Sequence, residues 1–279
     1  MNKLNSIDTL LIQQPFELDI NEKSRLFSDA IYDAFAHHME NNELFNNYCQ
    51  NKGFRLERNT VNLADYPYLP VNIFKNKRLT SVPNDKIKAI LNSSATTGIP
   101  STIVLDTITS KRQTIASAKV MADYLGDKRR PFLILDGDPF ESNMSEISAR
   151  SAATRGFLIL ASRQEYFLKK ENQNLTLDIK KLKDSIKSYE DTEQEICIFG
   201  FTYLLYQHVV KVLKEGGLSL QLPKNSKIAH IGGWKKLESQ KVTKEQFLKD
   251  ISDVFGVEVS NIFDFYGFTE QMGLVYVSI

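Results

Sequence analysis

The hydrophobic positions of the chain change their spacing at about residue 86. Upstream of it, apolar residues such as Leu26, Ala30 and Ala34 recur every four positions, which predicts helices over residues 1–60. The stretch 66–75 carries Pro67 and Pro70, which exclude a regular helix, so we expect an extended arm there. Residues 1–80 are therefore predicted to form a helical N-terminal segment followed by this arm.

Downstream, short apolar runs alternate with longer amphipathic segments. The apolar runs predict strands at residues 87–91, 102–105, 131–136, 157–160, 195–199, 227–231 and 257–265. The amphipathic segments predict helices at residues 109–125, 145–155, 175–189, 203–215 and 243–255. Thr243 is the expected N-cap of the last helix and Gly256 its C-terminal stop. This alternation favours right-handed crossovers, so we predict an α/β fold over residues 81–279, with a largely parallel sheet flanked by helices.

Composition and charge narrow the class of protein. The chain has 279 residues, with 35 Lys and Arg against 34 Asp and Glu, which argues against binding to nucleic acid or to an anionic membrane surface. The N-terminus has no apolar signal segment, and no uncharged apolar window reaches membrane-spanning length, so we expect a cytoplasmic protein. Cys197 lies in an apolar run and is expected to be a buried, inert thiol, and neither it nor Cys49 suggests a metal site or disulfide.

A loop rich in hydroxyl groups, residues 93–102, separates the first two predicted strands. It contains serines, threonines, Gly98 and Pro100 but no charge, and it is longer than an ordinary hairpin turn. Backbone N–H groups and small hydroxyl side chains suit an anion, although a plain Ser/Thr-rich loop is the alternative reading. No Lys follows Gly98 as a Walker A loop requires, which excludes a P-loop NTPase, and no strand precedes a G-x-G-x-x-G motif.

Two further motifs directly follow predicted strands. Gly232 and Gly233 come after the strand at 227–231, and Tyr266 and Gly267 come after the last strand. Because ligands of parallel sheets bind beyond the carboxyl ends of the strands, we expect these two motifs at the same edge of one sheet. Plain turns are the alternative reading of both motifs.

In this order, the loop 93–102, the run 230–235 (HIGGWK) and the segment 264–270 (DFYGFTE) resemble the adenylate-forming enzymes, which join a carboxylic acid to AMP. Within that superfamily the chain is most similar to the acyl-protein synthetases of the LuxE type, with phenylacetate–CoA ligases as near relatives. The GGWKK run and residues 69–75 favour the LuxE-like branch. The resemblance extends from about residue 60 to the end.

The resemblance implies a role for each motif. The residues that would bind the β- and γ-phosphates of ATP are Ser93, Ser94, Thr96, Thr97 and Gly98. Gly232 and Gly233 would border the adenine, and Tyr266, with Gly267 beside it, would stack on the adenine ring. Thr269 would contact the α-phosphate and Glu270 would hold Mg²⁺, which gives these two a catalytic role. A solvated carboxylate is the alternative reading of Glu270.

The implied reaction is ATP-dependent activation of a carboxylic (fatty) acid as an acyl-adenylate, followed by transfer of the acyl group to a protein thiol. An acyl reductase is the implied partner. An aryl- or acyl-CoA ligase is the alternative, and a degenerate nucleotide-binding protein without catalysis is the second. Two departures from the family pattern motivate the last: Ala95 stands where Gly is usual, and the chain ends nine residues after Glu270. We therefore expect the mobile C-terminal domain of the superfamily to be absent.

Overall fold

The computed structural model describes residues 5–58, 62–93, 98–138, 157–171, 174–234, 239, 241–271 and 275–278. The chain divides into two compact units. The first comprises Met1–Lys119 and Phe268–Leu274, and the second comprises Val120–Gly267 and Val275–Ile279. The domain boundary that we place between residues 80 and 81 stays a prediction.

Helices open the first unit, as expected for the helical N-terminal segment. They are α1 (Ser6–Ile12), α2 (Ile20–Asn41) and α3 (Glu43–Asn51). Each begins after a side chain that accepts a hydrogen bond from a backbone N–H of the first turn, namely that of Asn5, Asp19 or Asn42. The arm is not extended throughout. The 3₁₀ turn η1 (Leu63–Asp65) precedes it, and its last residues enter the short helix α4 (Ile73–Asn76), because Pro67 and Pro70 do not prevent a helix that begins beyond them.

A β-hairpin follows in the same unit. After the turn η2 (Asn84–Lys86), strands β1 (Ile87–Asn92) and β2 (Thr102–Asp106) pair antiparallel as a separate two-stranded sheet. The hydroxyl loop therefore joins two strands that pair only with each other among the described residues. The hairpin leads into the long helix α5 (Thr107–Leu125).

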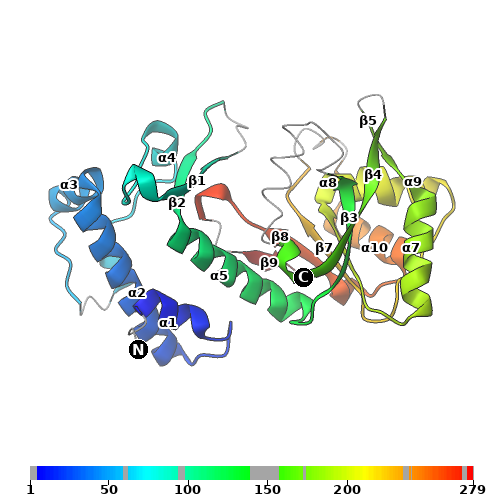
Figure 1. Cartoon of the computed structure of the whole chain (residues 1–279), viewed down its shortest axis with the longest axis horizontal. Coiled ribbons are helices and arrows are strands. Elements are labelled where there is room, and N and C mark those ends of the chain that lie inside the picture. Colours follow the sequence, from blue (N-terminus) through cyan, green and yellow to red (C-terminus); the bar gives the residue numbers. More distant parts are fainter. Residues whose placement is uncertain are drawn as a thin grey trace. The chain divides into compact units, whose positions relative to one another are not determined.

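A seven-stranded sheet forms the second unit (Figure 1). Its strands are, in spatial order, β5 (Asn174–Leu177), β4 (Ala161–Glu171), β3 (Arg130–Gly137), β6 (Cys197–Phe201), β7 (Lys227–Ile231), β8 (Ile262–Tyr266) and β9 (Tyr276–Ser278). The five central strands are parallel and the two edge strands are antiparallel. The predicted α/β fold with a largely parallel sheet is confirmed.

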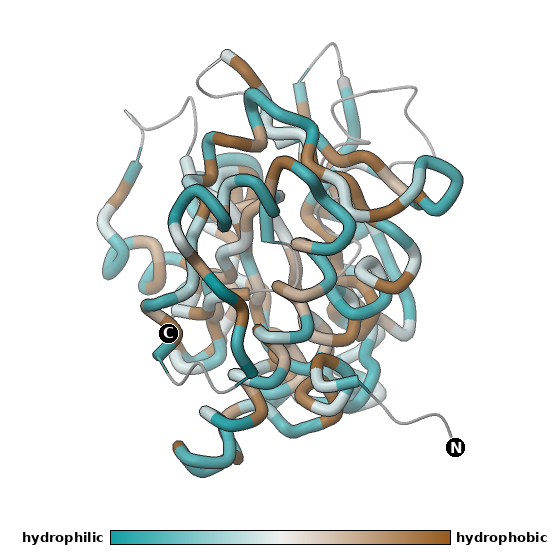
Figure 2. Tube along the Cα trace, turned by 90° about the vertical axis from the view of Figure 1, so that its left-hand side faces the viewer, coloured by the Kyte–Doolittle hydropathy of each residue, from teal (hydrophilic) through white to brown (hydrophobic). Residues whose placement is uncertain are grey.

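Both faces of this sheet are covered, which explains why β3 and β6 are buried along their whole length. The helical elements of the larger core are α7 (Ile179–Asp191), α8 (Thr202–Leu204), the π-helix η4 (Leu205–Val210), α9 (Lys211–Glu215) and α10 (Lys244–Phe255). On the other face, Met121 and Leu125 of α5 and Phe157 pack against β3 and β6. Helical turns in Figure 2 alternate between hydrophobic and hydrophilic colours, as expected for helices that bury one side.

Several predicted boundaries are wrong, all in short apolar runs that suit either a helix or a strand. The expected strand 157–160 is the 3₁₀ helix η3 (Phe157–Leu160), and its strand comes next, as β4. Residues 175–177 belong to β5 rather than to a helix, and the last strand starts only at Ile262, after the turn η6 (Val259–Asn261). The predicted helix 145–155 lies outside the described residues.

Candidate functional site

The hydroxyl loop joins β1 to β2 in the first unit. The Ser93 N–H donates to the Ser101 carbonyl at 3.0 Å, and the Ser101 N–H donates to the Ser93 hydroxyl at 2.8 Å, so these residues close the loop at its base. Because a hydroxyl that accepts a hydrogen bond keeps its own proton, Ser93 retains a donor for a phosphate oxygen. Gly98 has a φ of 98°, and a Cβ built there would meet nothing within 4 Å. Ser94, Ala95, Thr96 and Thr97 lie outside the described residues.

Thr269 and Glu270 belong to the same unit as this loop. Both are half-buried and form the 3₁₀ turn η7 (Thr269–Gln271), which lies against β2, the strand that leaves the loop. Two segments about 170 residues apart in sequence thus come together in the first unit, and both were singled out as contacting the phosphates or their metal ion.

In the second unit, Gly232 follows β7, and Tyr266 is the last residue of the neighbouring strand β8. Ile231 of β7 is in register with Phe265 of β8, so the next residue of each strand lies at the same edge of the sheet. Gly232 has a φ of 81°, a left-handed conformation that favours glycine. Gly233 is exposed, and a Cβ built there would meet nothing within 4 Å. Gly267 is also exposed and is the last residue of the segment Val120–Gly267 of this unit.

The Tyr266 side chain is 58% exposed, and its ring centroid is 6.2 Å from that of Tyr276 on β9. An open glycine backbone beside an exposed aromatic ring fits a flat heterocycle, which would stack on the ring and touch the backbone without meeting a Cβ. The residues present at this edge therefore fit an adenine base.

A buried hydrogen-bonded chain lies directly beneath Gly232. The Thr202 hydroxyl donates to the Gly232 carbonyl at 2.6 Å and lies 2.9 Å from Nδ1 of His230. The hydroxyl has a single proton, so Nδ1 of His230 must carry the proton that it donates to Thr202. The same nitrogen is 3.4 Å from Oδ1 of Asp264 on β8.

Burial, with a smaller contribution from Lys244, lowers the pKa of His230 to about 3, so the imidazole is neutral at ordinary pH. Burial raises the pKa of Asp264, and Lys244 opposes that shift. Neither His230 nor Thr202 is among the site residues predicted from the sequence. One signal in the sequence could have indicated Thr202. It is a hydroxyl residue that directly follows the buried strand β6, and β6 is the neighbour of β7, the strand that precedes the glycine pair.

Trp234, which follows the glycine pair, is buried. Its ring lies 5.3 Å from that of Tyr206 and 6.2 Å from that of Phe247, and the Phe247 ring lies 4.9 Å from His230. Tyr206 stands on the π-helix η4, a form that often occurs near functional sites. These contacts make Trp234 part of the core.

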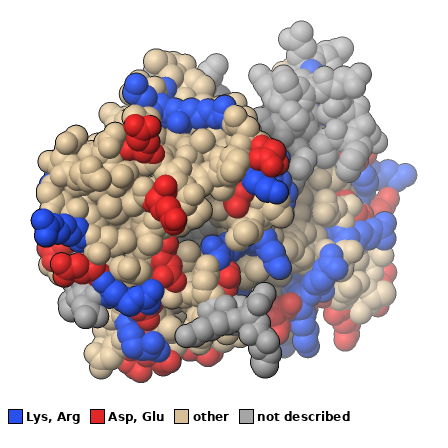
Figure 3. Space-filling model, turned by 60° about the vertical axis from the view of Figure 1, so that its left-hand side comes forward, with Lys and Arg blue, Asp and Glu red and all other residues tan. Residues whose placement is uncertain are grey.

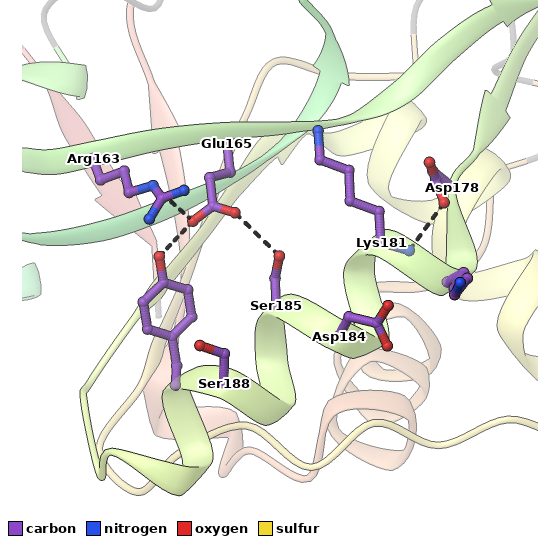
Figure 4. A pocket seen from close by; sticks show the side chains of 9 residues that line it. Arg163, Glu165, Asp178, Lys181, Asp184, Ser185 and Ser188 are labelled. Atoms are coloured by element: carbon purple, nitrogen blue, oxygen red, sulfur yellow. Dashed lines mark hydrogen bonds and ion pairs between the residues drawn. The ribbon is translucent and has the colours of Figure 1, made fainter.

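A hollow of the described surface lies elsewhere. It has a volume of about 480 Å³ and is lined by β4 and α7 (Figure 4). Glu165 is central to it and accepts hydrogen bonds from Tyr189 and from Ser185 (3.1 Å), with Nε of Arg163 at 3.3 Å. Burial and this carboxylate raise the pKa of Tyr189 to about 12. β4 is three positions from β7 in the sheet, so this hollow does not include the glycine pair.

Other kinds of site find no support in the described part of the chain. It contains no group of three or more His, Cys, Asp or Glu side chains placed to hold a metal ion. None of its helices is long and apolar enough to cross a membrane. Cys197 is buried, and burial raises the pKa of its thiol to about 12, as expected for an inert residue. Lys and Arg are interspersed with Asp and Glu on the face drawn in Figure 3.

Comparisons with known proteins agree with the fold. The chain is 24% identical over 262 residues to a long-chain-fatty-acid–luciferin-component ligase of Aliivibrio fischeri, covering 91% of this chain and 65% of the relative. It is 23% identical to the protein of the same description from Vibrio harveyi, covering 90% and 64%. A solved 2-hydroxyisobutyryl-CoA ligase shares the fold with a TM-score of 0.56 at 13% identity, over 88% of this chain and 49% of that one.

The chain thus spans slightly less than two thirds of the length of the curated relatives. The family described as acyl-protein synthetase, LuxE, matches residues 2–279, which is nearly the whole sequence. This chain belongs to the LuxE acyl-protein synthetase family.

Proposed function

We propose that this chain acts in the ATP-dependent activation of a carboxylic acid as an acyl-adenylate and in transfer of the acyl group to a protein thiol. The observation that carries the proposal is the edge of the second unit where Gly232, Gly233 and Tyr266 leave an open backbone face beside an exposed ring. It stands in a chain whose family match spans residues 2–279.

In the proposed first step, a carboxylate oxygen attacks the α-phosphorus of ATP and the bond to pyrophosphate breaks. Carboxylate and phosphates repel one another, so the protein must supply donors along the phosphates. Ser93 and the backbone near Gly98 are the described donors of the loop, and Ser94, Thr96 and Thr97 complete the proposed set. Thr269 is proposed to contact the α-phosphate. Its turn η7 lies against β2, in the unit that carries the loop.

Mg²⁺ is the proposed metal ion, with Glu270 as its protein ligand. This cation commonly binds through one or two carboxylates together with substrate phosphates and waters. A single half-buried carboxylate in a turn that lies against β2, the strand after the proposed phosphate loop, is consistent with such a site, whereas a cage of protein ligands is not needed.

In the proposed second step, a thiolate attacks the acyl carbon and AMP leaves. The curated relatives are named for long-chain fatty acids and for a luciferin component, so we propose a long-chain acid as the substrate and an acyl reductase as a partner. Cys197 is excluded as the acyl-accepting thiol by its burial and its raised pKa. The cytoplasm, expected from the N-terminal sequence, is the proposed location.

The test is ATP–pyrophosphate exchange that depends on added carboxylic acids of increasing chain length. We expect exchange with long-chain acids, and its loss in Glu270→Gln at every Mg²⁺ concentration. Glu258→Gln is the matched control, because Glu258 is exposed and outside the proposed site, and it should leave the rate unchanged. ATP binding without exchange for any acid would instead favour the nucleotide-binding protein without catalysis. Exchange unchanged in Glu270→Gln would refute the metal assignment.

The residue Ala95 has its own test. If glycine is needed at this position, Ala95→Gly should leave exchange equal or faster, because alanine strains a backbone with positive φ. A clear loss of exchange would contradict the proposed loop geometry.

A further inference from the structure

The peptide between Gly232 and Gly233 is held from below by buried side chains. The Thr202 hydroxyl binds the Gly232 carbonyl oxygen at 2.6 Å, and both Thr202 and His230 are buried. The described backbone contains no cis peptide bond, so this peptide is trans and planar, and its C=O and N–H point in opposite directions. A carbonyl directed inward to Thr202 therefore directs the Gly233 N–H to the opposite side of the peptide.

Gly233, which carries this N–H, stands in an open position. It is exposed, and a Cβ built on it would meet no described atom within 4 Å apart from its chain neighbours. The Thr202 hydroxyl could in principle rotate and release the carbonyl. Donation from Nδ1 of His230, at 2.9 Å, occupies a lone pair of the Thr202 oxygen and keeps the hydroxyl proton on the carbonyl. Asp264, facing the same nitrogen at 3.4 Å, favours the tautomer that makes this donation.

We propose that Thr202 and His230 are positioning residues that fix the Gly232–Gly233 peptide plane and thereby present the Gly233 N–H to the base of a bound adenine nucleotide. This inference rests on the proposed function, which supplies the nucleotide. Neither side chain touches the ligand. Their effect is to orient a donor in advance, so that binding does not have to order a flexible glycine turn.

Pairs of variants separate the effect of the hydrogen-bonding group from the effect of side-chain volume. Thr202→Val keeps the shape of the side chain and removes the hydroxyl, whereas Thr202→Ser keeps the hydroxyl. His230→Asn retains an N–H donor near the position of Nδ1, and His230→Leu removes it. Thr192→Val is the matched control, because the Thr192 hydroxyl also donates to a backbone carbonyl, that of Ser188 at 3.1 Å, at the end of α7.

The measurement is an ATP titration followed by the fluorescence of Trp234, which is the single Trp of the chain and adjoins Gly233. We expect about tenfold weaker ATP binding in Thr202→Val and His230→Leu, equivalent to about 1.4 kcal/mol. Thr202→Ser, His230→Asn and Thr192→Val should bind within about twofold of the parent, about 0.4 kcal/mol. In pyrophosphate exchange, the apparent KM for ATP should rise while the maximal rate stays near that of the parent.

A second measurement does not depend on the nucleotide. The amide resonance of Gly233 in a ¹⁵N-labelled sample should shift in Thr202→Val and return toward the parent position in Thr202→Ser. An unmoved Gly233 resonance, or ATP binding equal in the parent and Thr202→Val, would overturn the inference. If the parent binds no ATP while the Gly233 resonance shifts as expected, the peptide is positioned as inferred and the proposed function fails instead.

Discussion

Asp250 is a buried carboxylate that accepts hydrogen bonds from three side chains, and its removal gives a sharp prediction. Its side chain on α10 is 2% exposed and accepts hydrogen bonds from the Tyr206 hydroxyl (2.7 Å), the Gln246 amide (2.7 Å) and the Lys214 ammonium. Asp250→Ala leaves Tyr206 without an acceptor in the core. Gln246 and Lys214 reach the surface and can bind water instead.

The expected loss of stability follows from this difference in burial between Tyr206 and the other two donors. A buried donor without a partner costs about 1–3 kcal/mol, and hydrogen bonds to a charged group contribute about 1.5–3 kcal/mol each. Because two of the three donors can be rehydrated, we expect Asp250→Ala to lower the free energy of unfolding by about 3 kcal/mol. Asp253→Ala, on the same helix, removes only an exposed pair with Lys249 and should cost less than about 0.5 kcal/mol.

Denaturant unfolding followed by Trp234 fluorescence measures this loss, since the Trp234 ring lies 5.3 Å from Tyr206 in the same unit. Tyr206→Phe removes the stranded hydroxyl, so the double variant with Asp250→Ala should be at least about 1 kcal/mol more stable than the sum of the single losses predicts. Strict additivity, or a loss below about 0.5 kcal/mol for Asp250→Ala alone, would refute the reasoning.

The same contact has a defined pH dependence. Burial opposes ionisation, but the bonds from Lys214, Tyr206 and Gln246 outweigh it and hold the pKa of Asp250 below its ordinary value of 3.8. A lowered folded-state pKa adds stability above the unfolded-state pKa, and this contribution is lost as the pH falls through the folded-state value. The difference between the parent and Asp250→Ala should therefore be full at neutral pH and shrink below about pH 3.8.

Two further predictions concern the second unit. Gly256 ends α10 with a φ of 62°, and a Cβ there would collide with the side chain of Gln221, so Gly256→Ala should lower the free energy of unfolding by about 1–2 kcal/mol. An unchanged denaturation midpoint would contradict this. Adding Gln221→Ala should recover only the part of the loss that is due to the collision. Cys197 should not react with thiol reagents in the folded protein, because burial raises its pKa to about 12, and mass spectrometry should find it modified only under denaturing conditions; rapid modification of the native protein would show that the strand opens.

Local signals in the sequence predicted a large part of this fold correctly. The strand at 227–231 and the helix that begins after Thr243 and ends before Gly256 agree with the structure, and the Thr243 hydroxyl accepts the expected bond from Gln246 N–H at 3.2 Å. These features depend on residues within one turn or one strand. The run at 131–136, which is apolar up to its final residue Asp136, likewise predicted a strand, and this strand is β3, which is buried along its whole length.

Some features of the candidate site follow from the local sequence, and others depend on contacts between distant segments. The glycine pair and Tyr266 could be placed at strand ends from the sequence, because each directly follows its own strand. That they stand on neighbouring strands follows only from the sheet order β6, β7, β8 and its register. The sequence pattern also could not show that β1 and β2 pair with each other, since an apolar run of five residues does not indicate its partner.

The role of Thr202 is decided by tertiary structure alone. Its hydroxyl meets Gly232 and His230, which are 30 and 28 residues away, because β6 and β7 run parallel with Phe201 opposite Ile231. The sequence by itself determined which residue types stand at the ends of the strands and which segments form the layers. Only the packing of the sheet decided which of those residues share hydrogen bonds, because parallel register is set by contacts between distant segments rather than by neighbours in the chain.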